Sequence, residues 1–241
     1  ALLCAGGGRG DDAFLNFGET DDEDLYTDSS GYEDSSSNGF SVAIVHLFHR
    51  HLADSIAVLD QAVEVAMHDC TRVELLVIDD ASLHKDEAQA LRATVEGYVR
   101  RAKGGALAAR VHRNPHRPWG LTASLDLALK MVHSELVLVL GKGIKLQPGC
   151  IKAMASTFYS HPNVGAVTPL IMEPNLLDPL GAGGYIGEDG DLLSLVEQEP
   201  LGLEDSEHAL LSGNGLIFYD HNLNYVREAD FAPWACALLG R

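Results

Sequence analysis

The sequence predicts an α/β fold with a mainly parallel central sheet. Short runs rich in aliphatic and β-branched residues alternate with segments whose apolar residues recur at helical spacing. The connections are short, and several runs are apolar without interruption, as expected for strands buried on both faces. The chain has 241 residues, of which 46% are hydrophobic and 22% charged, which is sufficient for one sizeable core.

The predicted elements begin at about Phe40. Strands are expected at SVAIVHLF (41–48), VELLVIDD (73–80), ALAARVHRN (106–114), ELVLVL (135–140) and VGAVTPLI (164–171). The first three helices are predicted from the stripes Ile56, Leu59, Val63 and Met67, then Ala88, Leu91, Val95 and Val99, then Leu121, Leu125, Ala128 and Val132. The fourth helix is expected from about Pro148 to His161. In open parallel sheets ligands bind beyond the carboxyl ends of the strands, so the residues after the strands are the candidates for function.

Residues 1–38 differ in composition from the rest of the chain. They contain 10 Asp and Glu against only Arg9, as in GETDDEDLYTDSSGYEDSSSN. Such a segment buries too little apolar surface to offset the entropy of the free chain. We predict that residues 1–38 are an acidic disordered linker and that residues 39–241 form the domain. Phosphorylation of the Ser and Tyr residues among the acids is an alternative role for the segment.

The net charge of −18 disfavours nucleic acids as partners, because binding to phosphate backbones needs clustered Lys and Arg. The four cysteines are far apart and form no C-x-x-C pair, which indicates reduced thiols rather than a zinc knuckle or a disulfide framework. No stretch approaches the roughly 18 to 20 apolar residues that span a bilayer, and the start lacks a signal-peptide pattern. We therefore expect the given chain to be soluble and, since it lacks an initiator Met, to be a piece of a longer protein. The location of the full-length protein stays open, with membrane or Golgi association as the alternative.

The second predicted strand ends in Asp79-Asp80-Ala81-Ser82. Acids at a strand end can accept hydrogen bonds from ribose hydroxyls or from a base N–H, as nucleotide-binding folds do. Asp and Ser are equally typical of a turn and a helix cap, which is the alternative interpretation. Both remain open on the residues alone.

A series of motifs in register resembles family 2 glycosyltransferases, which are inverting enzymes with a GT-A fold that use a nucleotide-diphosphate sugar. LLVIDDAS resembles their V-D-D-G-S turn, and His49-Arg50 is similar to part of their P-T-Y-N-R segment. GLTASLDLALKMVHSELVLVL resembles A-x-N-x-G followed by G-E-Y, with Asp126 at the usual Asn position. The spacing agrees without gaps from Gly120 to Gly143. The resemblance implies a GT-A, Rossmann-like fold for residues 39–241.

The C-terminal third extends the resemblance to O-antigen and rhamnosyltransferase-like members. GAGGYIGEDGDL resembles A-G-G-x-I/L-x-x-D-G, and YVREADFAPWACALLGR resembles R-E-V-D-Y-x-S-G-A-C-L-L-I-R-R. This implies that Arg227, Glu228 and Asp230 support the acceptor side. In the family the second string precedes the region that supplies the catalytic base, so we expect the catalytic part to be incomplete at Arg241. Glu204-Asp205 is an alternative base, although a solvated loop is the favoured interpretation of this acidic stretch.

After the fourth strand the family has a D-x-D element whose carboxylates hold Mg²⁺ or Mn²⁺ against the diphosphate. The matching residues here are Gly141, Lys142 and Gly143, and glycine offers no ligand to a hard cation. We therefore predict no metal site of the family's kind. One hypothesis is that Lys142 and Lys145 partly neutralise the diphosphate in place of the metal. Loss of catalysis by drift is the alternative.

The resemblance implies transfer of a sugar from a nucleotide-diphosphate sugar to a glycan or lipid-linked acceptor. Asp79 and Asp80 would then contact the nucleoside, and the loop 141–143 would face the diphosphate. A noncatalytic module that binds nucleotide sugars or glycans is the alternative function. A zinc site at His46, His49 and His51 is disfavoured, because residues on or near a strand point to different faces.

Overall fold

The computed structural model describes residues 2–5, 39–82, 84–114, 118–172, 179–181, 183–186, 189, 191–194, 227–229, 232–233 and 235–241. Their elements, in chain order, are β1 (Leu2–Ala5), β2 (Ser41–Phe48), α1 (Leu52–Asp69), β3 (Arg72–Asp79), α2 (Lys85–Arg101), the 3-10 turn η2 (Lys103–Gly105), β4 (Leu107–Arg113), α3 (Leu121–Met131), β5 (Leu136–Leu140), α4 (Cys150–Ser160), β6 (Val164–Thr168), β7 (Ile171–Met172), β8 (Pro179–Gly181), β9 (Gly184–Ile186), β10 (Leu192–Ser194), β11 (Arg227–Ala229) and β12 (Cys236–Gly240). The nine elements predicted between residues 41 and 171 are present in the predicted order.

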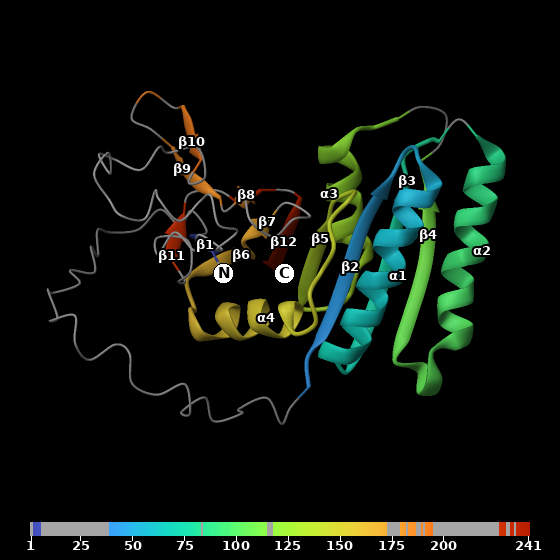
Figure 1. Ribbon diagram of the computed structural model, residues 1–241, viewed down its shortest axis with the longest axis horizontal. Coiled ribbons are helices and arrows are strands. Elements are labelled where there is room, and N and C mark those ends of the chain that lie inside the picture. The colour runs from blue at the N-terminus through green and yellow to red at the C-terminus, as the bar shows by residue number, and fades with distance from the viewer. Residues whose placement is uncertain are drawn as a thin grey trace, which may run out of the picture.

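Eight strands form a mixed central sheet in the order β11-β1-β6-β12-β5-β2-β3-β4. β5, β2, β3 and β4 make a parallel block, whereas β12 is antiparallel to both β5 and β6. In Figure 1 the parallel block lies beside α1 and α2, and the remaining strands lie toward α4. The predicted α/β fold with a mainly parallel central sheet is confirmed.

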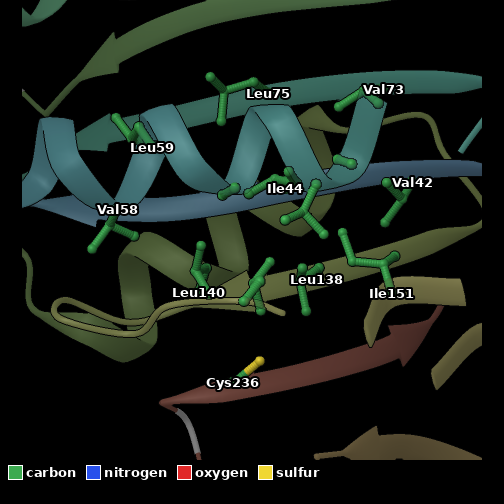
Figure 2. Close-up of a cluster of buried hydrophobic side chains, with 14 of the residues drawn as sticks. Val42, Ile44, Val58, Leu59, Val73, Leu75, Leu138, Leu140, Ile151 and Cys236 are labelled. Carbon is green, nitrogen blue, oxygen red and sulfur yellow. The ribbon is translucent and has the colours of Figure 1, made fainter. Parts of the chain in front are cut away.

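Alternation along the strands explains why the core has two layers. Val42 and Ile44 of β2 pack on one face of the sheet in a cluster with α1, α2 and α4, part of which Figure 2 shows. Ala43 and Val45 point the other way and pack in a second cluster with α3. All four side chains are fully buried. The parallel block is therefore covered on both faces, which leaves its strand ends as the accessible part.

The helices present slightly different stripes from those predicted. α1 turns Ala62 and Ala66 toward the core, and the predicted Val63 lies beside this stripe, partly buried. In α2 the last core residue is Tyr98 rather than the predicted Val99, and the Val99 side chain is 39% exposed. Small residues facing the sheet let a helix approach it closely, and this contact decides which side of a broad apolar stripe turns inward. None of the described helices combines the length and apolarity needed to cross a membrane.

The N-terminal residues differ from the prediction. The sequence predicts a disordered linker over residues 1–38, but Leu2–Ala5 form β1, which pairs with β6 and β11. These residues are an apolar run, LLCA, and they complete hydrogen bonds that β6 would otherwise leave open at an edge. Residues 6–38 lie outside the described residues, so the linker and the boundary at residue 39 stay predictions.

Candidate functional site at the carboxyl ends of the parallel strands

The carboxyl ends of β2, β3, β4 and β5 lie along one edge of the parallel block (Figure 1). From β2 the chain continues to β3 and β4 on one side, and then to β5 on the other side of β2. The order of the strands therefore changes direction between β2 and β5. In open α/β sheets such a switch point is where ligands bind. Both predicted donor-side groups, Asp79-Asp80 and Gly141–Gly143, follow strands that end at this edge.

Asp79 and Asp80 belong to opposite faces of the sheet, because neighbouring residues of an extended chain alternate. Asp80 reaches the α3 side, where its carboxylate is hydrogen-bonded to Gly120 and lies close to Ser124. Asp79 instead bonds to the turn residue Ser82 on the face that carries α1 and α2. The two acids cannot share one role.

The Asp80 carboxylate is occupied by donors of the protein itself. Oδ1 accepts hydrogen bonds from Asn114 Nδ2 at 2.7 Å and from the Trp119 N–H at 2.8 Å, and the Ser124 hydroxyl lies 3.4 Å away. Oδ2 accepts from the Gly120 N–H at 3.0 Å. Burial raises the pKa of Asp80, but these hydrogen bonds outweigh burial and hold the pKa below its usual range. These hydrogen bonds fasten the start of α3 to the end of β3. The helix that follows Asp80 in the chain is α2, and its N-cap residue is His84, so Asp80 is not a cap of that helix.

One oxygen of the Asp79 carboxylate accepts no hydrogen bond. The Asp79 side chain is 1% exposed, and Oδ1 accepts a hydrogen bond from the Ser82 N–H at 2.9 Å. Oδ2 has no hydrogen-bond partner and lies 3.6 Å from Arg113 Nε. Arg113 is held in place because its Nη2 donates to Ser82 O at 2.8 Å. One oxygen of Asp79 thus closes a turn, while the other lies in a partly buried ion pair with Arg113 and accepts no hydrogen bond.

Buried polar atoms without a hydrogen-bond partner gather at this edge of the sheet. Six such side-chain atoms occur in the described part of the chain, and four belong to residues at or near the ends of β2, β3 and β4: His46 Nε2, Asp79 Oδ2, Ser82 Oγ and Asn114 Oδ1. A buried polar atom left unpaired costs about 1–3 kcal/mol, so a group of them calls for a ligand or bound water. The carboxylate and amide oxygens are acceptors, and their natural partners are hydroxyl and N–H groups.

The backbone is strained at the same edge. Among the described residues other than glycine, positive φ angles occur at His51 (63°) and Ala81 (54°). His51 precedes α1 after the end of β2, and Ala81 lies in the turn after β3. Each such conformation costs on the order of 1–2 kcal/mol for an L-residue. Strain of this kind concentrates at functional sites, where the surrounding structure holds it in place.

The chain is held on both sides where it leaves β5. Leu140 O accepts a hydrogen bond from His46 Nδ1 at 2.9 Å, and the Gly141 N–H donates to Ala235 O at 2.7 Å. Burial lowers the pKa of His46, and its hydrogen bond to Leu140 offsets only part of that effect, so the imidazole is neutral at pH 7. A Cβ on Gly141 would lie 3.0 Å from Ala235 O and 3.1 Å from Ala235 Cα. Position 141 therefore has no room for a side chain unless the segment leading into β12 shifts.

The next two residues form an exposed turn. Gly143 has a φ of 82°, which favours glycine, and a Cβ there would meet nothing within 4 Å. Lys142 Nζ lies 3.2 Å from Asp54 Oδ2 in the first turn of α1. The two side chains are 44% and 58% exposed, so the ion pair is worth about 0–1 kcal/mol and is easily exchanged. Lys145, the second lysine of the hypothesis, is also exposed.

These residues do not fit a divalent metal ion. Two glycines provide no ligand, and the Asp54 carboxylate faces the ammonium group of Lys142. Mg²⁺ and Mn²⁺ need several oxygen ligands around one point. Over the part of the chain that the structure describes, no group of three or more His, Cys, Asp or Glu side chains is arranged to hold a metal.

The predicted acceptor-side residues do not join this site. Arg227 and Glu228 lie in β11, which is separated from β5 by β1, β6 and β12. At about 4.8 Å between neighbouring strands, β11 is roughly 19 Å from β5. Asp230 and Glu204-Asp205 lie outside the described residues. The acceptor role of these residues stays a prediction.

Sequence reasoning missed two members of the site, Arg113 and Asp54. Arg113 is the last residue of β4, so the rule that strand ends carry function could have identified it. Asp54 lies in the first turn of a helix, where acids are common for local reasons. Only its distance to Lys142 distinguishes it from an ordinary first-turn acid.

No family model and no curated protein matches the sequence. Among solved structures, similar chains include a mannosyltransferase from Pyrobaculum calidifontis in complex with GDP-Man and Mn²⁺ (20% identity, 57% of this chain and 37% of that chain, TM-score 0.44). Others are the M. tuberculosis glucosyl-3-phosphoglycerate synthase (19%, 57% and 47%, TM-score 0.42) and mannosyl-3-phosphoglycerate synthase from Rubrobacter xylanophilus (14%, 83% and 54%, TM-score 0.44). This chain spans 37% to 54% of the lengths of these three proteins.

Proposed function

We propose that this chain binds a nucleotide-diphosphate sugar at the carboxyl ends of the parallel strands. In this proposal it is the donor-binding part of a glycosyltransferase that moves the sugar to a glycan or lipid-linked acceptor. The observation that carries the proposal is the group of buried polar atoms without a hydrogen bond at the ends of β3 and β4: Asp79 Oδ2, Ser82 Oγ and Asn114 Oδ1. The motif resemblance at LLVIDDAS supports the same location.

A nucleoside offers the chemistry that these atoms need. Ribose hydroxyls and base N–H groups are donors, and Asp79 Oδ2 and Asn114 Oδ1 are buried acceptors. Asn114 Nδ2 already donates to Asp80 and lies 3.0 Å from Ser124 Oγ, which fixes the orientation of the amide. Asp80 therefore acts indirectly, as the residue that orients Asn114 and holds α3 against the strand end.

Transfer from the donor needs two further groups besides nucleoside recognition. The leaving diphosphate must be stabilised, and a base must accept the proton of the attacking hydroxyl. Lys142 lies at the switch point between β2 and β5, where a diphosphate joined to a nucleoside near β3 would extend. We assign the base to none of the described residues.

Calorimetric titration of UDP-, GDP- and dTDP-sugars into the wild type and Asp79→Asn tests the proposal. Asn keeps the size of the side chain but removes its charge, and we expect at least about a 10-fold loss of affinity, or about 1.4 kcal/mol. Asp86→Asn is the matched control, because Asp86 is an exposed acid in the first turn of α2. Failure of all three donors to bind, or equal affinity in Asp79→Asn, would contradict the proposal.

A noncatalytic nucleotide-sugar or glycan-binding module is the second candidate. It is favoured by the contact of Gly141 with Ala235, which leaves no room for an acid at the metal position of the motif. Release of nucleoside diphosphate from a bound donor, measured on the longest natural form of the protein, separates the two functions. Binding without release or transfer favours the module, and turnover favours the enzyme.

A further inference from the structure

We infer that Lys142 neutralises the donor's diphosphate without a divalent cation, by exchanging its ion pair with Asp54 for a phosphate oxygen. This rests on the proposed function, because it concerns the charged part of the same ligand. No bond is made or broken in the exchange. The ammonium group changes its partner, and Asp54 returns to solvent.

The Lys142–Asp54 pair spans the switch point. Lys142 follows β5 and Asp54 lies in the first turn of α1, the helix that follows β2. β5 and β2 are adjacent parallel strands, with Leu140 opposite His46 at the last paired position. A ligand bound beyond these two strand ends would lie beside the pair. The ammonium group of Lys142 is thus placed where the diphosphate of a ligand would lie.

The loop is shaped for this pair rather than for metal ligands. Gly141 is packed against Ala235, and the preceding carbonyl of Leu140 is held by His46. Gly143 has a φ of 82°, in the left-handed region that glycine adopts without cost. Neither glycine offers a ligand, a side chain at position 141 would crowd Ala235, and Lys142 between them projects to Asp54.

The exchange requires little reorganisation. The side chains of Lys142 and Asp54 are 44% and 58% exposed, so the pair is screened by water and a diphosphate can compete for the ammonium group. A diphosphate presents several charged oxygens, whereas Asp54 presents one carboxylate. Asp54 also repels an incoming anion. Its removal is therefore expected to favour binding, which is the opposite of what a structural or metal-binding role predicts.

The experiment measures Kd by calorimetry for UDP, GDP and dTDP, and for uridine, guanosine and thymidine, with EDTA or with MnCl₂. We expect diphosphate affinity to change less than about 2-fold between EDTA and Mn²⁺, to fall at least about 10-fold in Lys142→Ala and to rise roughly 2- to 5-fold in Asp54→Asn. The double variant should stay well below wild-type affinity, because the lysine that the Asp54 substitution would release is absent. Nucleoside affinity should be the same in all variants.

The pair Lys130–Asp126 provides a matched control. It is an exposed i,i+4 ion pair on α3 with Nζ and Oδ2 2.6 Å apart, and Lys130→Ala and Asp126→Asn should leave diphosphate affinity unchanged. Binding that requires Mn²⁺, equal affinity in Lys142→Ala, or weaker binding in Asp54→Asn would each overturn the inference. If nucleosides bind and Asp79→Asn weakens them, these results overturn the inference alone. If neither nucleosides nor diphosphates bind, the proposed function fails as well.

Discussion

The end of β3 and the end of β5 lie on the same edge of the sheet, yet they are built in opposite ways. At β3 two acids are buried, and one of them, Asp80, is hydrogen-bonded by protein donors on both oxygens. At β5 a glycine is packed against the backbone of Ala235, and Lys142 forms an exposed ion pair. The end of β3 therefore has a fixed hydrogen-bonding geometry, whereas the end of β5 carries an ammonium group that can change its partner.

Asp80→Ala should produce the largest effect, because it removes the acceptor of one buried and two partly buried hydrogen bonds. Asn114 Nδ2 would keep only Ser124 Oγ, the Gly120 N–H would lose its acceptor, and we expect a loss of about 3 kcal/mol in the free energy of unfolding. Urea denaturation followed by circular dichroism measures the loss. Asp54→Ala is the control and should change stability by less than about 1 kcal/mol. Similar losses of unfolding free energy in Asp80→Ala and Asp54→Ala would mean that the ends of β3 and β5 do not differ in how firmly they are held.

Gly141→Ala tests whether the end of β5 is fixed by packing. The added Cβ would lie 3.0 Å from Ala235 O, and overpacking of this kind costs about 1–3 kcal/mol. Gly143→Ala is the comparison variant: it meets nothing within 4 Å but has a φ of 82°, so only backbone strain of about 1 kcal/mol is expected. Thermal unfolding of both variants gives the order. A larger loss in Gly143→Ala would mean that conformation rather than contact dictates the loop.

The pH dependence of stability should reflect Asp80. Its hydrogen bonds outweigh burial and lower its pKa in the folded state below the unfolded value of about 3.9. A lowered folded pKa gives stability that is present above the unfolded pKa and is lost as pH falls through the folded pKa. We expect the difference in unfolding free energy between wild type and Asp80→Asn to be constant from pH 7 to about 5 and to shrink below about pH 4. A difference that persists unchanged at pH 3 would contradict this account.

Lys142→Ala should have the smallest effect on stability. Because both side chains of its ion pair are largely exposed, we expect a change of less than about 0.5 kcal/mol in the free energy of unfolding. Chemical denaturation in low salt, where surface charges are least screened, is the most sensitive measurement. A loss comparable to that of Asp80→Ala would show that Lys142 has a structural role and not an exchangeable one.

The sequence predicted the strand ends that form the candidate site better than it predicted the contacts of each residue there. The strand ends at Asp79 and Leu140 follow from local patterns, because alternation and apolar runs are visible within a few residues. The separate roles of Asp79 and Asp80 were not predictable, because they depend on α3 lying on one face of the sheet. Nor was β1, since an apolar run of four residues becomes a strand only when a neighbouring strand is available.

The sequence by itself determined the order of strands and helices from residue 41 to 171 and the lack of metal ligands at Gly141-Lys142-Gly143. The tertiary structure decided that β12 lies between β5 and β6, so that Ala235 excludes a side chain at position 141, and that Asp54 faces Lys142. The reason is physical: secondary structure depends on periodicity over a few turns or residues. Contacts between residues far apart in the chain depend on the order of strands in the sheet, which no local pattern contains.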